Sequence, residues 1–189
     1  MILYLHGFRS SPASLKARQM AQAMQQAGRS AEFICPQLPA SPAAAIALAQ
    51  QLCADWHPEE TTIIGSSLGG FYATWLAEQL ACRAVLLNPA VKPPRDLASY
   101  IGVTTQYHSD EVFEFKADYV PELIQLAIPA ITHPERYFLI AATGDEVLDW
   151  REMVAHYPGA KQQIIPGSSH SLNEFADYLP AVLAFCDAR

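Results

Sequence analysis

Short apolar runs recur along this chain, and segments with helical patterning follow most of them. Runs of four to eight such residues bounded by turn residues are typical of strands buried on both faces, as parallel strands are. The six predicted strands are Ile2–Leu5, Ala31–Cys35, Thr61–Ile64, Arg83–Leu87, Arg136–Ala142 and Gln162–Ile165. The pattern therefore predicts a parallel sheet with helical connections.

The first predicted helix covers about residues 12–27. Ser11 is its candidate N-cap, Pro12 occupies the tolerated first position, and Gly28 ends it. Its leading apolar positions, which are compatible with one buried stripe, are Leu15, Met20 and Met24.

Four more helices are expected between and after the remaining strands. Their approximate ranges are Ser41–Trp56, a helix after Ser67, Trp150–His156 and Leu172–Cys186. Strand and helix alternate through short links, which favours an α/β fold with a parallel sheet. The 189 residues contain no internal repeat and no low-complexity linker, so we expect one domain, residues 1–189.

The regular alternation breaks between about residues 91 and 135. This stretch contains a predicted helix, Pro121–Ala127, and a group of ring-bearing side chains: Tyr100, Tyr107, His108, Phe113, Phe115 and Tyr119. An insertion after the fourth strand would lie over the carboxyl ends of the strands, where open α/β sheets bind ligands. We expect a small lid lined partly by aromatics. An ordinary helical connection whose aromatics serve the core remains the alternative.

The amino-acid composition argues against some kinds of binding partner. The net charge of −7 and pI near 5.3 argue against nucleic acid, and 51% apolar with 16% charged residues is typical of a globular protein. No signal peptide and no membrane-spanning segment are expected. The scattered Cys35, Cys53, Cys82 and Cys186 form no metal or redox motif. Free thiols in a cytoplasmic protein are the expectation, with a zinc or redox site as the less favoured alternative.

The stretch Thr61–Gly70 carries the first chemical motif. A β-branched strand runs into Gly65-Ser66-Ser67-Leu68-Gly69 and then into a helix, which is the context that the G-x-S-x-G pattern requires. A nucleophilic serine at the tip of such a turn needs a strained backbone, and Gly65 and Gly69 allow close approach of strand and helix. Ser67 would then lie at a helix N-terminus, where negative charge is stabilised. A plain strand-to-helix loop is the competing interpretation.

A nucleophilic serine needs a base and an oriented carboxylate, and two later loops offer them. Asp145 directly follows the fifth predicted strand and His170 directly follows the sixth. The order serine, acid, histidine, each at the carboxyl end of a strand, predicts a triad of Ser67, Asp145 and His170. Asp149 and Glu146 share the acid loop and remain alternatives.

The other candidates fit less well. Ser66 is one residue off the tip of the turn, and His6 precedes the nucleophile, where the loop that stabilises an oxyanion is expected. We expect the remaining histidines to be surface or structural residues: His57, His108, His133 and His156.

An oxyanion hole requires two backbone N–H donors. The residue after the nucleophile, Leu68, is one candidate, and Phe8 in the loop His6-Gly7-Phe8 is the other. Because these donors belong to the main chain, His6 and Gly7 enter as residues that shape the loop.

Five motifs together resemble the small YqiA-type bacterial esterases of the α/β-hydrolase superfamily. They are His6-Gly7-Phe8-Arg9-Ser10-Ser11-Pro12, Gly65-Ser66-Ser67-Leu68-Gly69-Gly70, Asn88-Pro89-Ala90, Thr143-Gly144-Asp145-Glu146-Val147-Leu148-Asp149 and Gly167-Ser168-Ser169-His170. The resemblance covers essentially the whole chain. It implies a minimal α/β-hydrolase fold with six parallel strands in the order 2-1-3-4-5-6, without the two leading antiparallel strands of larger members.

The resemblance also implies a function. It implies a serine esterase acting on short acyl esters or thioesters, with no metal or organic cofactor and with Ser67, Asp145 and His170 as nucleophile, acid and base. The same scaffold can serve a lyase or a carbon–carbon hydrolase, and a ligand-binding module is a further alternative. The physiological substrate and the oligomeric state do not follow from the sequence.

Overall fold

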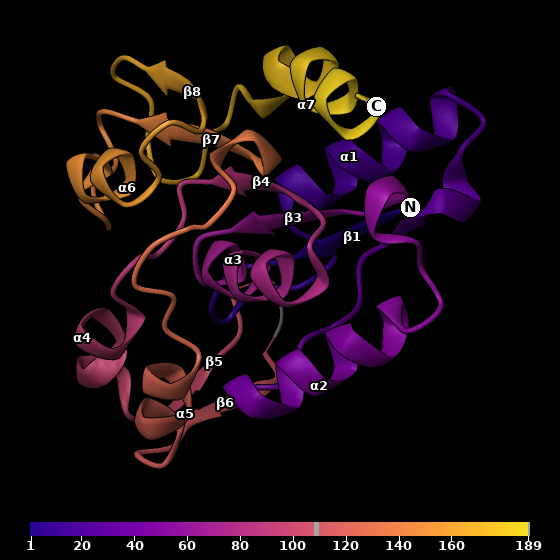
Figure 1. Ribbon diagram of the computed structural model, residues 1–189. Coiled ribbons are helices and arrows are strands. Elements are labelled where there is room, and N and C mark those ends of the chain that lie inside the picture. Colours follow the sequence, from indigo (N-terminus) through magenta and orange to yellow (C-terminus); the bar gives the residue numbers. More distant parts are fainter. Residues whose placement is uncertain (108–109, 189) are drawn as a thin grey trace.

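The computed structural model describes residues 1–107 and 110–188. Its main sheet is parallel, with the strand order β2-β1-β3-β4-β7-β8 (Figure 1). The strands are β1 Ile2–Leu5, β2 Phe33–Ile34, β3 Thr62–Ser66, β4 Arg83–Leu87, β7 Tyr137–Ala142 and β8 Lys161–Ile165. Counted within this sheet alone, the order is 2-1-3-4-5-6, as predicted.

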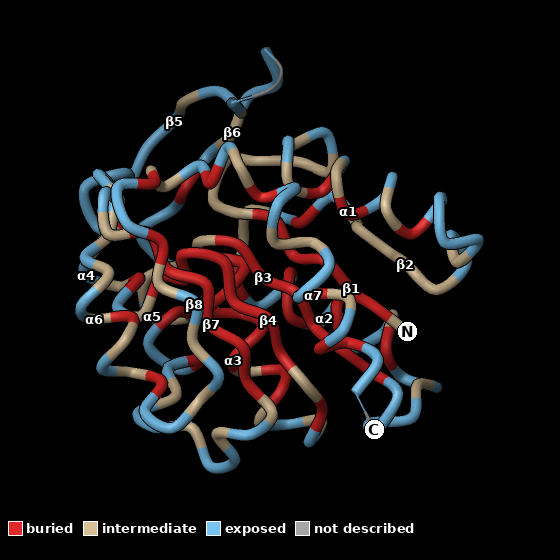
Figure 2. Tube along the Cα trace, turned by 90° about the horizontal axis from the view of Figure 1, so that it is seen from above, coloured by how far each residue is buried: buried red, intermediate tan, exposed pale blue. Residues whose placement is uncertain are grey.

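Helices cover both faces of the sheet, and successive strand residues alternate between two cores. Leu3 and Ile63 pack on the face covered by α2 Pro42–Cys53, α3 Leu68–Leu80 and α6 Trp150–His156. Tyr4 and Ile64 pack on the opposite face, under α1 Leu15–Gln26 and α7 Leu179–Cys186. Because both faces are buried, the strands read as continuous apolar runs. Figure 2 shows the buried residues gathered along these strands.

The first helix begins later than predicted. Ser11 is not its N-cap: the Ser11 hydroxyl accepts a hydrogen bond from the Ala13 N–H at 3.2 Å, in a turn that precedes the helix. Serine favours such local turns as strongly as it favours caps. The helix starts at Leu15, which is 39% exposed and therefore does not belong to the expected buried stripe. Met20 and Met24 are fully buried, as expected.

The last predicted helix is also shorter than expected. Leu172 has a left-handed backbone (φ 49°), and a 3-10 turn, Phe175–Tyr178, precedes α7. By contrast, α2 begins as predicted, because the Ser41 hydroxyl accepts a bond from the Ala44 N–H at 3.1 Å. The helix α6 has the predicted bounds.

The stretch between β4 and β7, residues 88–136, is here called the insertion. It contains α4 Pro93–Leu97, the antiparallel pair β5 Gly102–Thr105 and β6 Val112–Phe115, and α5 Tyr119–Gln125. Sequence patterning indicated a helix near α5 but missed the β5–β6 pair. Leu97, Phe115 and Leu123 join the core beside α2 and α3, so part of the predicted aromatic lining serves the core instead. His108 lies outside the described residues.

All four cysteines are free, with Cys35 partly buried and the others buried. Burial raises the pKa of the Cys35 thiol to about 12 and that of Cys53 to about 11, so both stay protonated near neutral pH. Across the described part of the chain, the helices are too short or too polar to cross a bilayer.

Candidate active site

The turn at Ser67 combines a strained backbone with close packing. Ser67 connects β3 to α3 and has φ 54° and ψ −120°, a conformation that costs about 1–3 kcal/mol in a residue with a side chain. A Cβ on Gly65 would lie 2.2 Å from the Gly69 carbonyl oxygen, and a Cβ on Gly69 would lie 2.0 Å from that of Leu5. The strand and helix backbones therefore approach too closely at Gly65 and Gly69 for a side chain, as the sequence predicted.

Hydrogen bonds hold this turn in place. The Ser67 N–H donates to the Leu87 carbonyl at 3.0 Å, and the Ser67 carbonyl accepts from the N–H groups of Gly70 and Ala90 at 2.9 and 3.0 Å. Leu68 is the first residue of α3, a position whose N–H lacks an intrahelical acceptor. Ser66 is the last residue of β3 and is only 7% exposed.

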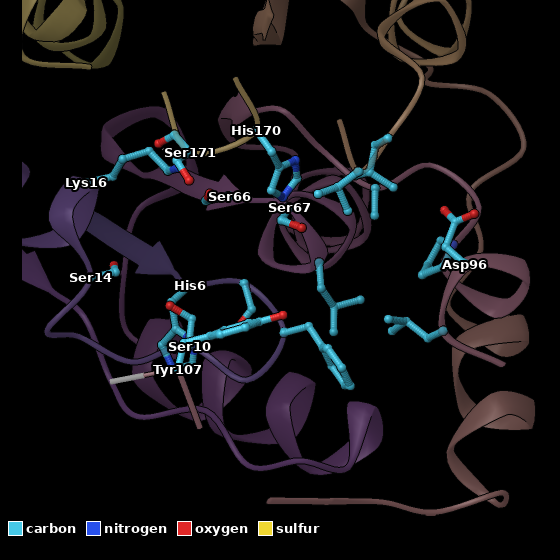
Figure 3. A pocket seen from close by; sticks show the side chains of 18 of the residues that line it. His6, Ser10, Ser14, Lys16, Ser66, Ser67, Asp96, Tyr107, His170 and Ser171 are labelled. Atoms are coloured by element: carbon cyan, nitrogen blue, oxygen red, sulfur yellow. Dashed lines mark hydrogen bonds between the residues drawn. The ribbon is translucent and has the colours of Figure 1, made fainter. Parts of the chain in front are cut away.

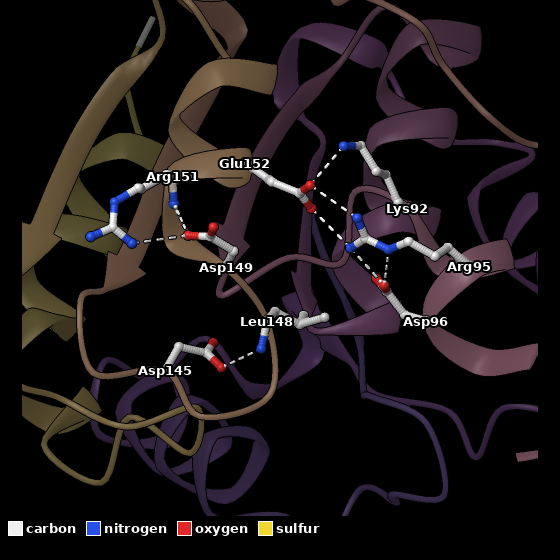
Figure 4. Close-up of polar contacts among 8 residues, drawn as sticks. All are labelled: Lys92, Arg95, Asp96, Asp145, Leu148, Asp149, Arg151 and Glu152. Atoms are coloured by element: carbon white, nitrogen blue, oxygen red, sulfur yellow. Dashed lines mark hydrogen bonds and ion pairs between the residues drawn. The ribbon is translucent and has the colours of Figure 1, made fainter. Parts of the chain in front are cut away.

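Asp145 and His170 are in direct contact. His170 Nδ1 lies 2.7 Å from Asp145 Oδ2, and the Asp145 side chain has no exposed surface. The N–H groups of Val147 and Leu148 both donate to Asp145 Oδ1, at 2.8 Å each, and Figure 4 shows the bond from Leu148. The carboxylate is thus held by three bonds. The His170 ring points toward Ser67 in Figure 3.

The two alternative acids have other partners. Asp149 caps α6, with its Oδ1 accepting from the Arg151 N–H at 2.9 Å. Glu146 Oε2 accepts from the backbone N–H of His170 at 3.0 Å, so this carboxylate contacts the main chain rather than the imidazole. Of the three acidic residues, Asp145 is the one hydrogen-bonded to the His170 ring.

The loop after β1 lies against the nucleophile turn. A Cβ on Gly7 would lie 3.2 Å from the Ser67 Cβ and 3.8 Å from its Oγ. His6 fixes this loop: its Nε2 accepts from the Leu38 N–H at 3.0 Å, and its Nδ1 lies 3.0 Å from the Gly7 carbonyl oxygen. A ring that accepts at Nε2 and donates at Nδ1 is neutral. These contacts fit His6 as a loop-shaping residue.

Phe8 connects this loop to the insertion. Its ring packs edge-on against Phe113 and Phe115, with centroids 5.1 and 5.3 Å apart. Next to it, Arg9 Nε donates to the Thr105 carbonyl at 2.7 Å, and the Arg9 guanidinium lies 4.5 Å from the centre of the Tyr107 ring. The loop after β1 and the β5–β6 pair are therefore fastened together.

A cavity of about 810 Å³ opens over these groups. Its lining combines Ser67 and His170 with the loop after β1 and with the insertion, which contributes Pro93, Asp96, Leu97, Tyr100 and Tyr107. A volume near this size suits a small organic ligand. No set of three His, Cys, Asp or Glu side chains within the described residues is arranged to hold a metal ion.

The other described histidines apart from His6 and His170 do not line this cavity. His57 is exposed at the start of a 3-10 turn, and His133 Nδ1 pairs with Glu135 at 2.9 Å. His156 packs against the Tyr157 ring, and burial lowers the pKa of its imidazole.

The sequence analysis gave no role to two polar residues at the site, although Asn88 belongs to one of the motifs that carry the resemblance. Lys16 on α1 lines the cavity, and Asn88 is fully buried beside the His170 loop. The helix pattern gave no signal that Lys16 turns inward. Asn88 stands directly after a strand end, which was the available signal.

The fold is that of an α/β-hydrolase, as the similarity to solved structures shows. Est1E from Butyrivibrio proteoclasticus, in a structure with bound ferulic acid, superposes with a TM-score of 0.74 at 12% identity, covering 100% of this chain and 89% of that one. Mouse alpha/beta hydrolase domain-containing protein 10 has a TM-score of 0.71 at 15% identity, covering 98% and 87%. Tomato methylketone synthase I, an H243A variant complexed with β-ketoheptanoate, has a TM-score of 0.68 at 11% identity, covering 98% and 96%.

The chain belongs to the uncharacterised protein family UPF0227, whose family model matches residues 1–187. This match spans nearly the whole length and confirms the resemblance drawn from the motifs. The solved structures agree on the fold, which is that of an α/β-hydrolase.

Proposed function

We propose that this protein is a serine hydrolase that cleaves small carboxylic esters or thioesters through an acyl-enzyme. The observation that carries the proposal is the 2.7 Å contact between Asp145 and a His170 ring that points toward Ser67. Acyl transfer by a serine requires this geometry, and the order serine, acid, histidine, each after a strand end at one edge of the sheet, is the order of α/β-hydrolases.

The proposed first step forms the acyl-enzyme. Asp145 holds the Nδ1–H of His170, which leaves Nε2 to take the Ser67 proton as Oγ attacks the carbonyl carbon. The N–H groups of Phe8 and Leu68 stabilise the resulting oxyanion. When the carbon–oxygen or carbon–sulfur bond breaks, His170 returns the proton to the leaving alcohol or thiol.

The second step releases the acid. Water takes the place of the alcohol or thiol, and His170 removes a proton from it as it attacks the acyl carbon. When the tetrahedral intermediate collapses, the bond to Ser67 Oγ breaks, His170 returns the proton to Oγ, and the carboxylic acid leaves. The insertion acts as a lid in this proposal, because its side chains complete the cavity wall. The four free thiols fit a protein of the reducing cytoplasm.

Labelling with a fluorophosphonate followed by peptide mass spectrometry tests the proposal without knowledge of the substrate. The expected adduct is on Ser67, and His170→Ala abolishes it. Absence of an adduct on folded wild-type protein would overturn the proposal in favour of a ligand-binding module.

A lyase or a carbon–carbon hydrolase is the second candidate, because one fold can serve different reactions and this fold is shared with tomato methylketone synthase I, whose structure holds β-ketoheptanoate. Such reactions use the serine in proton transfer rather than in acylation. Rapid quenching during turnover of an activated ester distinguishes the two candidates: an acyl group on Ser67 supports the esterase, and turnover without it supports the alternative.

A further inference from the structure

Lys16 brings a positive charge into the candidate active site that the proposed acyl transfer does not use. Its side chain extends from α1 along the cavity wall to the loop of His170, where Nζ donates to the Ser171 carbonyl at 2.7 Å (Figure 3). Ser171 directly follows His170. The ammonium group therefore lies beside the base, on the same wall of the cavity.

The Lys16 ammonium group has N–H donors that remain available for a ligand. An ammonium carries three N–H donors, and the Ser171 carbonyl takes one. Among the described residues no carboxylate forms an ion pair with Lys16. Burial lowers the pKa of Lys16 to about 8, while the nearby charge of Asp145 works in the opposite direction. At pH 7 the side chain is therefore mostly charged and partly desolvated, and among the described residues it forms no direct ion pair.

The surroundings of Lys16 also suit an anion. Ser10, Ser14 and Ser171 line the same part of the cavity, and hydroxyl groups donate readily to carboxylate or phosphate oxygens. The opposite side of the cavity carries Asp96, which Figure 3 shows far from Lys16. Asp96 is paired with Arg95 at 2.7 Å, and Glu146, which also lines the cavity, accepts from the backbone N–H of His170. Among the described residues that line the cavity, Lys16 is the one lysine or arginine.

We propose that Lys16 is a specificity-determining residue that binds a carboxylate or phosphate on the alcohol part of the ester. This inference rests on the proposed function. We place the anionic group on the alcohol part of the ester because His170 delivers its proton to the leaving alcohol. Lys16 is hydrogen-bonded to Ser171, the residue next to His170. Charge-assisted hydrogen bonds of this kind are worth roughly ten- to a hundredfold in kcat/KM.

Matched esters test the inference. The probes are para-acetoxybenzoate and its neutral counterpart para-acetoxybenzamide, with para-acetoxyphenyl phosphate as the arm that distinguishes phosphate from carboxylate. The quantity compared is the ratio of kcat/KM for the anionic ester to kcat/KM for the neutral ester, in which intrinsic differences in ester reactivity cancel between variants. Lys16→Met is expected to lower this ratio at least tenfold, and Lys16→Arg to retain most of it.

Arg18→Met is the matched control. Arg18 lies two residues further along α1 and is exposed, so the variant removes the same charge from the same helix outside the cavity. The ratio is expected to stay within about twofold of the wild-type value, because exposed charges at a distance are screened.

The outcomes separate the two proposals. If both esters are cleaved and Lys16→Met leaves the ratio unchanged, the inference is wrong and the hydrolase proposal stands. If neither ester is cleaved and Ser67 forms no fluorophosphonate adduct, both proposals fail. Should Lys16→Met not fold, inhibition of the wild type by para-hydroxybenzoate and para-hydroxybenzamide decides: the anion must bind more tightly, and equal inhibition overturns the inference.

Discussion

Asn88 fixes the backbone of His170 through its side-chain amide. Asn88 Nδ2 donates to the carbonyl oxygens of His170 and Ser169, at 3.1 Å each, and its Oδ1 accepts from the Ala142 N–H at 2.8 Å. Ala142 ends β7, the strand that leads to Asp145. One fully buried side chain thus joins the acid loop to the histidine loop.

Replacing Asn88 is therefore expected to affect activity as well as stability. Asn88→Ala removes the partners of the buried Ala142 N–H and the part-buried His170 carbonyl, while the Ser169 carbonyl keeps its bond from the Leu172 N–H. We expect a cost of about 2–4 kcal/mol in unfolding free energy, since each unpaired group costs about 1–3 kcal/mol. Turnover of an activated ester should fall at least tenfold, because the His170 loop loses its anchor. Urea unfolding and initial-rate kinetics measure the two effects.

Asn88→Asp separates positioning from folding. The carboxylate keeps the acceptor for the Ala142 N–H but faces the carbonyls of Ser169 and His170 without a donor. The expected result is a loss of turnover in a folded protein, with a shifted pH–rate profile for the base. An unchanged profile together with full activity would show that Asn88 has no part in placing His170.

The contact between Gly7 and Ser67 gives a second prediction. Gly7→Ala would place a Cβ 3.2 Å from the Ser67 Cβ, which is too close unless the loop or the turn shifts by a few tenths of an ångström. Such a shift misplaces the Phe8 N–H, and loss of an oxyanion donor costs roughly a hundred- to a thousandfold in kcat. Steady-state kinetics with para-nitrophenyl acetate measures the loss.

Gly28→Ala is the control for Gly7→Ala. Gly28 has φ +70° and nothing within 4 Å of an added Cβ, so alanine there is strained without touching the cavity. It should lower stability by about 1 kcal/mol and leave turnover intact. A Gly7→Ala protein as active as Gly28→Ala would contradict the proposed role of the loop.

Structural features that depend on residues close together in the sequence, or on the ends of parallel strands, could be predicted from the sequence. The strained turn at Ser67 was predictable because its glycines, strand and helix are neighbours in the chain. Asp145 and His170 were predictable because parallel strands end at one edge of the sheet, so a position after a strand implies a position in space.

The features that the sequence did not reveal depend on distant contacts. The β5–β6 pair is held by Phe8 and Arg9, about a hundred residues earlier, and its own alternation is too short to stand out. Likewise, the sequence shows Lys16 only as a polar residue on a helix. Its position in the cavity depends on the hydrogen bond to the Ser171 carbonyl, 155 residues away. The pattern of apolar and polar residues along the chain does not indicate which distant residues contact each other.

Glu152 gives a prediction about pH and stability. It joins α6 to the insertion through Lys92 Nζ at 2.7 Å and through both terminal nitrogens of Arg95 at 2.9 Å (Figure 4). Bonds from Arg95 and then Lys92 lower the pKa of Glu152 to about 2. A lowered carboxyl pKa stabilises the fold above the unfolded-state value, near 4.3, and this contribution is lost as pH falls toward 2.

Glu152→Gln is therefore expected to destabilise the protein by about 1 kcal/mol at pH 6 and low salt, given partial exposure of the pair. The difference from wild type should shrink between pH 4.3 and pH 2 and also at high salt. Denaturant unfolding across this pH series measures it, with exposed Glu59→Gln as the control. A difference that grows as the pH falls would contradict the assignment.

The choice of acid can be decided with one matched pair of substitutions. Asp145→Asn removes the negative charge beside His170 and favours the wrong imidazole tautomer, so kcat should fall roughly 10³–10⁴-fold while the protein stays folded. Asp149→Asn makes the same change four residues away. Because asparagine is as good an N-cap as aspartate, α6 keeps its cap and kcat should change less than about twofold. If Asp149→Asn instead gave the larger loss, the acid would be Asp149, and the observed pairing of Asp145 with His170 would be structural.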